Sequence, residues 1–157
     1  MGHDWRAYYR SSSTRKAQHF GSCGALPLRA GLGHGDRMPG AIEQITVESL
    51  SGWLAQKRAV LLVDVRERWE HTTAALPQSL LLPMSEMGDA EETRSQLQEA
   101  IAARAPGDLT VVAYCHHGVR SLNAAAYFQS LGFEGVISLA GGIDAWSLRI
   151  DPTVPRY

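Results

Sequence analysis

A continuous apolar run at residues 59–63 limits the possible folds of this chain more than any other feature. The run reads Ala59-Val60-Leu61-Leu62-Val63, contains no polar side chain and is rich in branched residues. Strands that are buried on both faces of a parallel sheet have this composition. We therefore expect an α/β domain in which helices cover both faces of a parallel sheet.

Other short strands alternate with helical patterns on either side of this run. Strand patterns fall at residues 43–45, 80–82, 109–114 and 136–139, and helical patterns fall after Thr46, at 89–104, at about 119–131 and after Gly141-Gly142. This order predicts a doubly wound parallel sheet of about five short strands. The face of the helix at 119–131 that packs on the sheet is predicted from four spaced residues: Leu122, Ala125, Ala126 and Gln129.

Two of the predicted helices begin after residues that are suited to cap them. Thr46 precedes a small amphipathic helix, and Asp89 precedes a helix with acidic residues in its first turn. Side chains of Thr and Asp accept hydrogen bonds from the unpaired N–H groups of a first helical turn. We expect both residues to be N-caps, and we expect Trp146, on the last helix, to lie in the core.

Residues 1–40 differ in composition from the rest of the chain. They hold three consecutive serines, many glycines and six Lys/Arg residues against two acidic residues, and they show no apolar periodicity. We expect a disordered extension before a domain that covers residues 41–157. Met38 stands directly before the first patterned residues and is a candidate for the natural start. Transit peptides are also rich in arginine and serine, but no clear amphipathic helix emerges here.

Composition excludes several classes of function. The net charge of -1 leaves no basic surplus for nucleic acid, and no apolar run is long enough for a membrane helix. Cys23 and Cys115 lie far apart in regions of different character, so we do not expect a disulfide framework. A reducing compartment, and hence a cytoplasmic protein, fits best.

The stretch from Val111 to Ser121 predicts a strand, a thiol, a loop and a helix in succession. Residues with strand character run into Cys115, and a glycine and an arginine follow within the loop at Gly118 and Arg120. A loop that enters a helix start points unpaired N–H groups at whatever the sulfur carries, so negative charge is favoured there. The thiolate, which is the reactive form of cysteine, should be well populated.

The residues of this loop also fit a core strand or a metal site. Free cysteines are among the most buried residue types, so Cys115 alone could be an ordinary core residue. A core strand does not need the two imidazoles, the glycine and the arginine that follow it. His116 and His117 could be metal ligands, but sequence neighbours usually point apart and no further Cys/His cluster completes a zinc site. We therefore expect no metal.

Three motifs together resemble a single-domain rhodanese. They are the Cys115–Ser121 run CHHGVRS, the upstream run LVDVRE at 62–67 and the downstream run LAGGIDAW at 139–146. Their order and spacing match that family over about residues 41–157. The stretch at 74–79 reads AALPQS, where many relatives have a glycine-histidine pair before Ile-Pro-Gly-Ala, so one wall of the pocket departs from the pattern.

The resemblance implies a sulfurtransferase with Cys115 as the nucleophile and no cofactor. The remaining loop residues would surround the substrate: His116, His117, Gly118, Val119, Arg120 and Ser121. His117 and Arg120 are the candidates for steering an anionic donor, whereas His116 is expected to face the solvent. Asp64 and Arg66 are supporting candidates at a strand end, where the alternative is a solvated salt bridge; Asp64 would orient the loop through backbone hydrogen bonds.

The same resemblance separates related chemistries by loop length. Six residues from cysteine to arginine are typical of sulfurtransferases, and one more is typical of the cell-cycle phosphatases of the same fold; Cys115 to Arg120 counts six. The implied partners are thiosulfate as donor and a thiol or cyanide as acceptor, with thioredoxin or a sulfur-carrier protein as further possibilities. The alternatives are an interaction module without turnover and a cysteine phosphatase or arsenate reductase.

Overall fold

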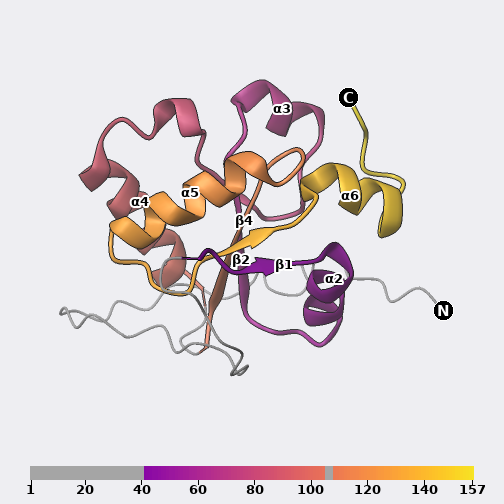
Figure 1. The fold of residues 1–157 in the computed structure, drawn as a ribbon, viewed down its shortest axis with the longest axis horizontal. Helices are drawn as coiled ribbons and strands as arrows, with labels where there is room; N and C mark the ends of the chain where they lie inside the picture. The colour runs from indigo at the N-terminus through magenta and orange to yellow at the C-terminus, as the bar shows by residue number, and fades with distance from the viewer. Residues whose placement is uncertain (1–40, 105–107) are drawn as a thin grey trace.

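A fully parallel five-stranded sheet forms the centre of the computed structural model, which describes residues 41–104 and 108–157. The predictions for residues 1–40 lie outside this part. The strand order is β1-β5-β4-β2-β3, and every adjacent pair is parallel (Figure 1). The strands are β1 (Gln44–Ile45), β2 (Val60–Asp64), β3 (Leu80–Leu81), β4 (Thr110–Tyr114) and β5 (Ile137–Leu139).

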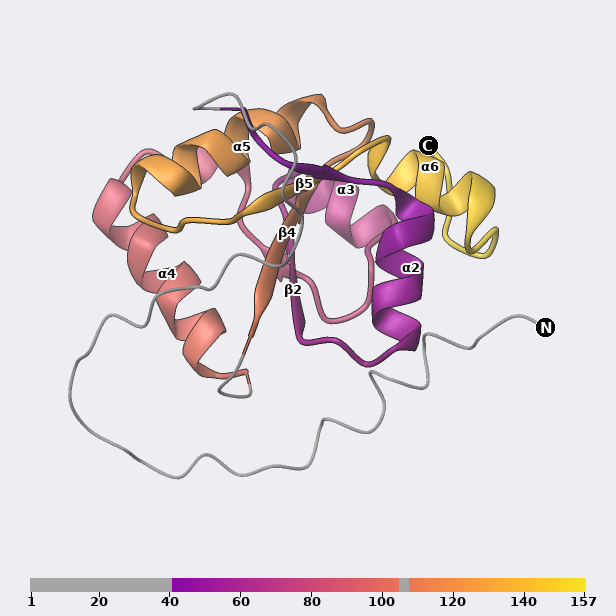
Figure 2. The same cartoon turned by 60° about the horizontal axis from the view of Figure 1, so that its bottom comes forward.

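Helices cover both faces of this sheet. They are α2 (Val47–Ala55), α3 (Arg68–Thr73), α4 (Ala90–Ala102), α5 (Val119–Ser130) and α6 (Gly142–Arg149), with a 3-10 turn η1 at Met84–Glu86. Figure 2 shows α4 and α5 on one side of the strands and α2 and α6 on the other. The predicted doubly wound α/β architecture is therefore confirmed.

The apolar run at 59–63 becomes β2, which pairs with β4 on one side and β3 on the other. Its side chains alternate between the two layers because successive residues of a strand point to opposite faces. Leu62 packs with the core under α2 and α6, where Trp146 is fully buried as expected. Leu61 and Val63 pack with the core under α4 and α5.

Both predicted N-caps are confirmed. The Thr46 hydroxyl accepts the N–H of Ser49 at 3.2 Å, and the Asp89 carboxylate accepts the N–H groups of Glu91 and Glu92, each at 2.9 Å. These bonds satisfy donors that the first helical turn leaves without partners.

Two predictions about helices were wrong or incomplete. The buried side of α5 consists of Ser121, Ala124, Ala125 and Phe128, so the predicted face was displaced by one residue. Ala126 is exposed, and Leu122 and Gln129 are only partly buried. The short helix α3 was not predicted at all. Among the described residues, no helix is both long and apolar enough to cross a lipid bilayer.

Candidate active site

Cys115 directly follows β4, at the edge of the sheet where the parallel strands end. The chain then passes through His116 and His117 to Gly118, which is the N-cap of α5 and has a φ of 98°. A Cβ at Gly118 would lie 3.0 Å from the backbone nitrogen of Gly141, so glycine suits both the turn and the close approach. The predicted succession of strand, thiol, loop and helix is confirmed. Figure 1 shows the chain running from β4 into α5.

The Cys115 sulfur lies at the base of this loop. Its Sγ accepts the backbone N–H of Gly118 at 3.1 Å and lies 3.6 Å from the Ser121 hydroxyl oxygen. The thiol can donate to this hydroxyl oxygen, whose own hydrogen is directed at the Gly118 carbonyl. Cys115 is only 1% exposed and thus shares the burial of an ordinary core cysteine, but an N–H donor points at its sulfur.

Two serines connect the start of α5 to β5 behind the sulfur. The Ser121 hydroxyl donates to the Gly118 carbonyl at 3.0 Å, and its oxygen lies 2.8 Å from that of Ser138. Both serines are fully buried. Buried hydroxyls need such partners, and this pair fixes the first turn of α5 relative to the sheet.

The first turn of α6 holds the other side of the loop. The carbonyls of Cys115 and His116 accept the N–H groups of Ile143 and Asp144, at 2.9 and 3.1 Å. Gly142 makes this approach possible, because a Cβ there would lie 2.3 Å from both carbonyl oxygens. The glycine pair at 141–142 therefore fixes the direction of the first loop carbonyls as well as the turn into α6.

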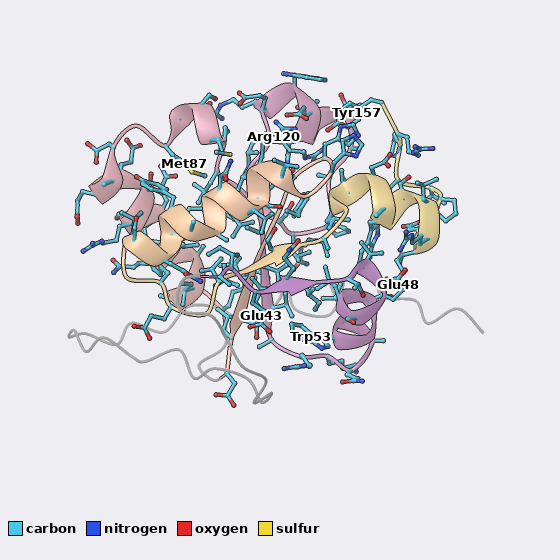
Figure 3. All side chains as sticks on the ribbon, in the orientation of Figure 1. Glu43, Glu48, Trp53, Met87, Arg120 and Tyr157 are labelled. Atoms are coloured by element: carbon cyan, nitrogen blue, oxygen red, sulfur yellow. The ribbon has the colours of Figure 1, made fainter. Side chains whose placement is uncertain are left out.

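Arg120 is paired with Glu70, a partner that was not predicted from the sequence. The Arg120 guanidinium donates to both Glu70 carboxylate oxygens, at 2.6 and 2.7 Å, and the Tyr157 hydroxyl donates to the same carboxylate at 2.9 Å. Figure 3 shows Arg120 and Tyr157 at the same edge of the molecule, beside α3. The hydrogen bond from Arg120 lowers the pKa of Glu70 to about 2.

Asp64 and Arg66 form a buried ion pair rather than a solvated strand end. Arg66 Nε and Nη2 donate to the two Asp64 carboxylate oxygens at 2.8 and 2.6 Å, and both side chains are fully buried. Arg66 also donates to the carbonyl of Ala74 at 2.6 Å and to the Tyr157 hydroxyl at 2.6 Å. The alternative of a solvated salt bridge at the strand end was therefore right about the ion pair and wrong about its exposure to solvent.

Asp64 forms more hydrogen bonds with side chains than with the backbone, through which it was expected to orient the loop. It accepts one backbone N–H, from Arg66 at 3.1 Å, and its other oxygen accepts the Tyr114 hydroxyl at 2.9 Å and lies 2.8 Å from His71 Nδ1. Burial raises the pKa of Tyr114, which keeps that phenol protonated as a donor. This network joins the ends of β2 and β4 to α3.

The two loop histidines stack on each other. The ring centroids of His116 and His117 are 4.0 Å apart, and His116 also stacks on Tyr157 at 4.6 Å. His116 is partly buried between these rings, so the expectation that it faces the solvent was wrong; burial and the neighbouring His117 lower its pKa. The His117 side chain is 66% exposed, with Nδ1 3.9 Å from an Asp144 oxygen.

The remaining loop residue, Val119, is 68% exposed at the start of α5. Among residues 41–104 and 108–157, no three His, Cys, Asp or Glu side chains gather as a metal site would need.

Of the site residues that were not predicted, Glu70 had a weak signal in the sequence. A glutamate three residues after a helix N-cap commonly accepts the N–H of that N-cap. Glu70 accepts the Glu67 N–H in this way, at 2.9 Å. Tyr157 gave no local signal.

The lowered pKa of Glu70 predicts an acid dependence of stability. The pKa falls from 4.5 to about 2 on folding, so the contribution of this group is fully present above about pH 4.5 and is lost as the pH falls toward 2. We expect the difference in unfolding free energy between the wild type and Glu70→Gln to shrink across this range, as measured by urea titration at several pH values. A difference that does not vary with pH would contradict the pairing.

Comparisons with known proteins agree with this geometry. The profile of the rhodanese-like domain matches residues 46–149. A sulfurtransferase from Allochromatium vinosum is 38% identical over 113 residues, which cover 72% of this chain and 95% of the relative. The human single-domain sulfurtransferase TSTD1 has a structure with a TM-score of 0.55 and 31% identity, covering 68% of this chain and 96% of that one.

One similar protein is longer than this chain, and the match covers about a quarter of its length. The probable adenylyltransferase/sulfurtransferase MoeZ of Mycobacterium tuberculosis is 34% identical over 72% of this chain, which spans 26% of the length of MoeZ. The family match covers both the cysteine loop and the glycine pair that holds it. The chain belongs to the rhodanese-like sulfurtransferase family.

Proposed function

We propose that this protein moves a sulfane sulfur from a donor such as thiosulfate to a thiophilic acceptor through a persulfide on Cys115. The single observation that carries this proposal is the N–H of Gly118, which lies 3.1 Å from the Cys115 sulfur within a loop held by α6. A fixed N–H donor directed at a sulfur stabilises negative charge on it. Both the attacking thiolate and the persulfide anion carry that charge.

The reaction takes place in two steps. In the first, the Cys115 thiolate attacks the outer sulfur of thiosulfate, the S–S bond of the donor breaks, and sulfite leaves with the bonding electron pair. In the second, the acceptor, cyanide or a thiolate, attacks the terminal sulfur of the persulfide and takes it, and the Cys115 thiolate is restored. Because the donor product leaves before the acceptor reacts, the kinetics should be ping-pong.

The other predicted site residues divide by position. The side chains of His117 and Arg120 are 66% and 37% exposed, so a donor can reach them, and they remain the candidates for steering its sulfonate. Asp64 and Arg66 are buried behind the loop, so we assign them a supporting role. Thioredoxin or a sulfur-carrier protein is a suitable cellular acceptor, and we propose a cytoplasmic location in keeping with a free thiol.

Intact mass spectrometry tests the proposal. The purified protein is incubated with thiosulfate and should gain the mass of one sulfur atom, and cyanide should then remove that atom as thiocyanate. Sulfur gain that cyanide cannot discharge would contradict transfer. Failure to gain sulfur from any donor would favour an interaction module, and turnover of an aryl phosphate would favour a phosphatase.

A further inference from the structure

The net charge near Cys115 depends on the ion pair between Arg120 and Glu70. Its guanidinium is near enough to Cys115 that a thiolate there raises the pKa of Arg120, although the hydrogen bond to Glu70 contributes most to that rise. The Arg120 side chain is 37% exposed, whereas that of Glu70 is 5% exposed. The cation is therefore in contact with solvent, and the acid that neutralises it is buried.

Glu70 is firmly placed for this pairing. One carboxylate oxygen accepts from Arg120 and from the Tyr157 hydroxyl, and the other accepts from Arg120 and from the Glu67 N–H. Tyr157 is itself fixed by the Arg66 guanidinium at 2.6 Å. Four donors thus hold the carboxylate against the guanidinium, and a donor sulfonate that binds Arg120 must compete with a charged partner that is already in place.

A second acid adds to this effect. Asp144 lies 3.9 Å from His117 Nδ1 and accepts from Arg156 Nε at 2.8 Å. The two candidates for steering the donor, Arg120 and His117, are therefore each next to a carboxylate. With a carboxylate beside each candidate, the charges near the loop largely cancel, which weakens the attraction of a doubly charged donor.

We infer that Glu70 is a positioning residue that sets which donor charge the site prefers. By holding Arg120, it disfavours doubly negative sulfur donors relative to singly negative ones. This inference rests on the proposed sulfur transfer and deepens it. Thiosulfate carries two negative charges, and an aryl thiosulfonate carries the same sulfane sulfur with one. In both cases the Cys115 thiolate takes the outer sulfur, the donor's S–S bond breaks, and sulfite or the aryl sulfinate leaves with the electron pair.

The test compares Glu70→Gln with the wild type on these two donors. The second-order rate constant of persulfide formation is measured by quenched-flow mass spectrometry with thiosulfate and with benzenethiosulfonate. A glutamine keeps one acceptor oxygen, and glutamine at this helical position is compatible with the bond to the Glu67 N–H. We expect the rate constant for thiosulfate to rise about tenfold and that for benzenethiosulfonate roughly threefold, because the freed cation attracts the dianion more strongly.

Glu86→Gln is the matched control. Glu86 accepts two hydrogen bonds from Arg68 in an exposed pair, so its replacement removes the same charge from the same kind of ion pair outside the loop. It should leave the ratio of the two rate constants unchanged. If Glu70→Gln folds poorly, Arg120→Gln, which removes the cation and leaves the Glu70 carboxylate, should shift the ratio in the opposite direction.

The outcomes separate this inference from the proposed function. Equal changes for the two donors, or no change, in a Glu70→Gln protein that still forms the persulfide would overturn the role of Glu70 and leave sulfur transfer intact. A matching shift in Glu86→Gln would mean that net charge, and not Arg120, governs the preference. No persulfide in the wild type with either donor would overturn both.

Discussion

Replacing Cys115 with serine should abolish sulfur loading and reduce sulfur transfer by on the order of ten-thousandfold or more. The hydroxyl of serine is a far weaker nucleophile than a thiolate, and it cannot form a persulfide. The decisive measurement is thiocyanate production from thiosulfate and cyanide, together with intact mass after incubation with thiosulfate. Sulfur gain by Cys115→Ser would place the reactive atom elsewhere in the chain.

The serine variant should remain folded, which makes it a fair test of chemistry. Serine is smaller than cysteine by the difference between an oxygen and a sulfur, and its oxygen can accept the same N–H of Gly118. Circular dichroism and thermal unfolding provide the control. If the serine variant does not fold, Cys115→Ala replaces it as the test. The alanine side chain has no polar atom and fits the apolar cluster around position 115.

Gly142→Ala should have the largest effect on stability and loop geometry. The added Cβ would lie 2.3 Å from two backbone carbonyl oxygens, and the φ of 59° at Gly142 already disfavours a side chain. Because both obstacles are backbone atoms, the loop must move. We expect a loss of about 3 kcal/mol in unfolding free energy. The rate constant of sulfur loading should fall about a hundredfold, since displacement by an ångström has that effect on a reacting group.

Gly52→Ala is the control for this substitution. Gly52 lies within α2, and a Cβ there would meet nothing within 4 Å. Alanine is the better helix former, so the variant should be as stable as the wild type or up to about 1 kcal/mol more stable. Wild-type loading by Gly142→Ala would show that the close contact between α6 and the loop does not shape the site.

The sheet could be predicted from the sequence because its strands have strong local signals. The run at 59–63 and the strand before Cys115 are apolar and bounded by polar turns, and their parallel pairing followed from the alternation with helices. The helix α3 has only six residues, too few for a clear 3.6-residue period, and its N-cap is a glutamate rather than a Ser, Thr or Asp. Its position therefore required the tertiary structure.

The error on α5 has a specific cause. Ser121 belongs to the buried side, and the true face follows the expected spacing through Ala124, Ala125 and Phe128. A serine is normally counted as polar in a periodicity analysis, so the predicted face began one residue late, at Leu122. The buried hydroxyl is satisfied by Gly118 and Ser138, and neither contact could be seen in the local pattern.

The site was predictable only where its residues are close in sequence. Cys115 and its loop could be located from residues 111–121. Glu70, the partner of Arg120, is 50 positions away in the sequence. Tyr157, whose hydroxyl accepts a hydrogen bond from Arg66, is 91 positions from that arginine. Such contacts come from the crossover topology, which brings the end of β2, α3 and the tail to one edge of the sheet. The expected charge on the loop was therefore incomplete without Glu70.

The depth of Cys115 has a consequence for which molecules can react with each form of the protein. With 1% of its surface exposed, Cys115 presents almost none of its sulfur to bulk solvent, so a reagent must enter the loop to reach Sγ. In the proposed mechanism a second sulfur, attached by a bond of about 2 Å, would become the terminal atom of this side chain. If the proposed transfer holds, an acceptor would then need to reach only that terminal atom and not the buried Sγ of Cys115.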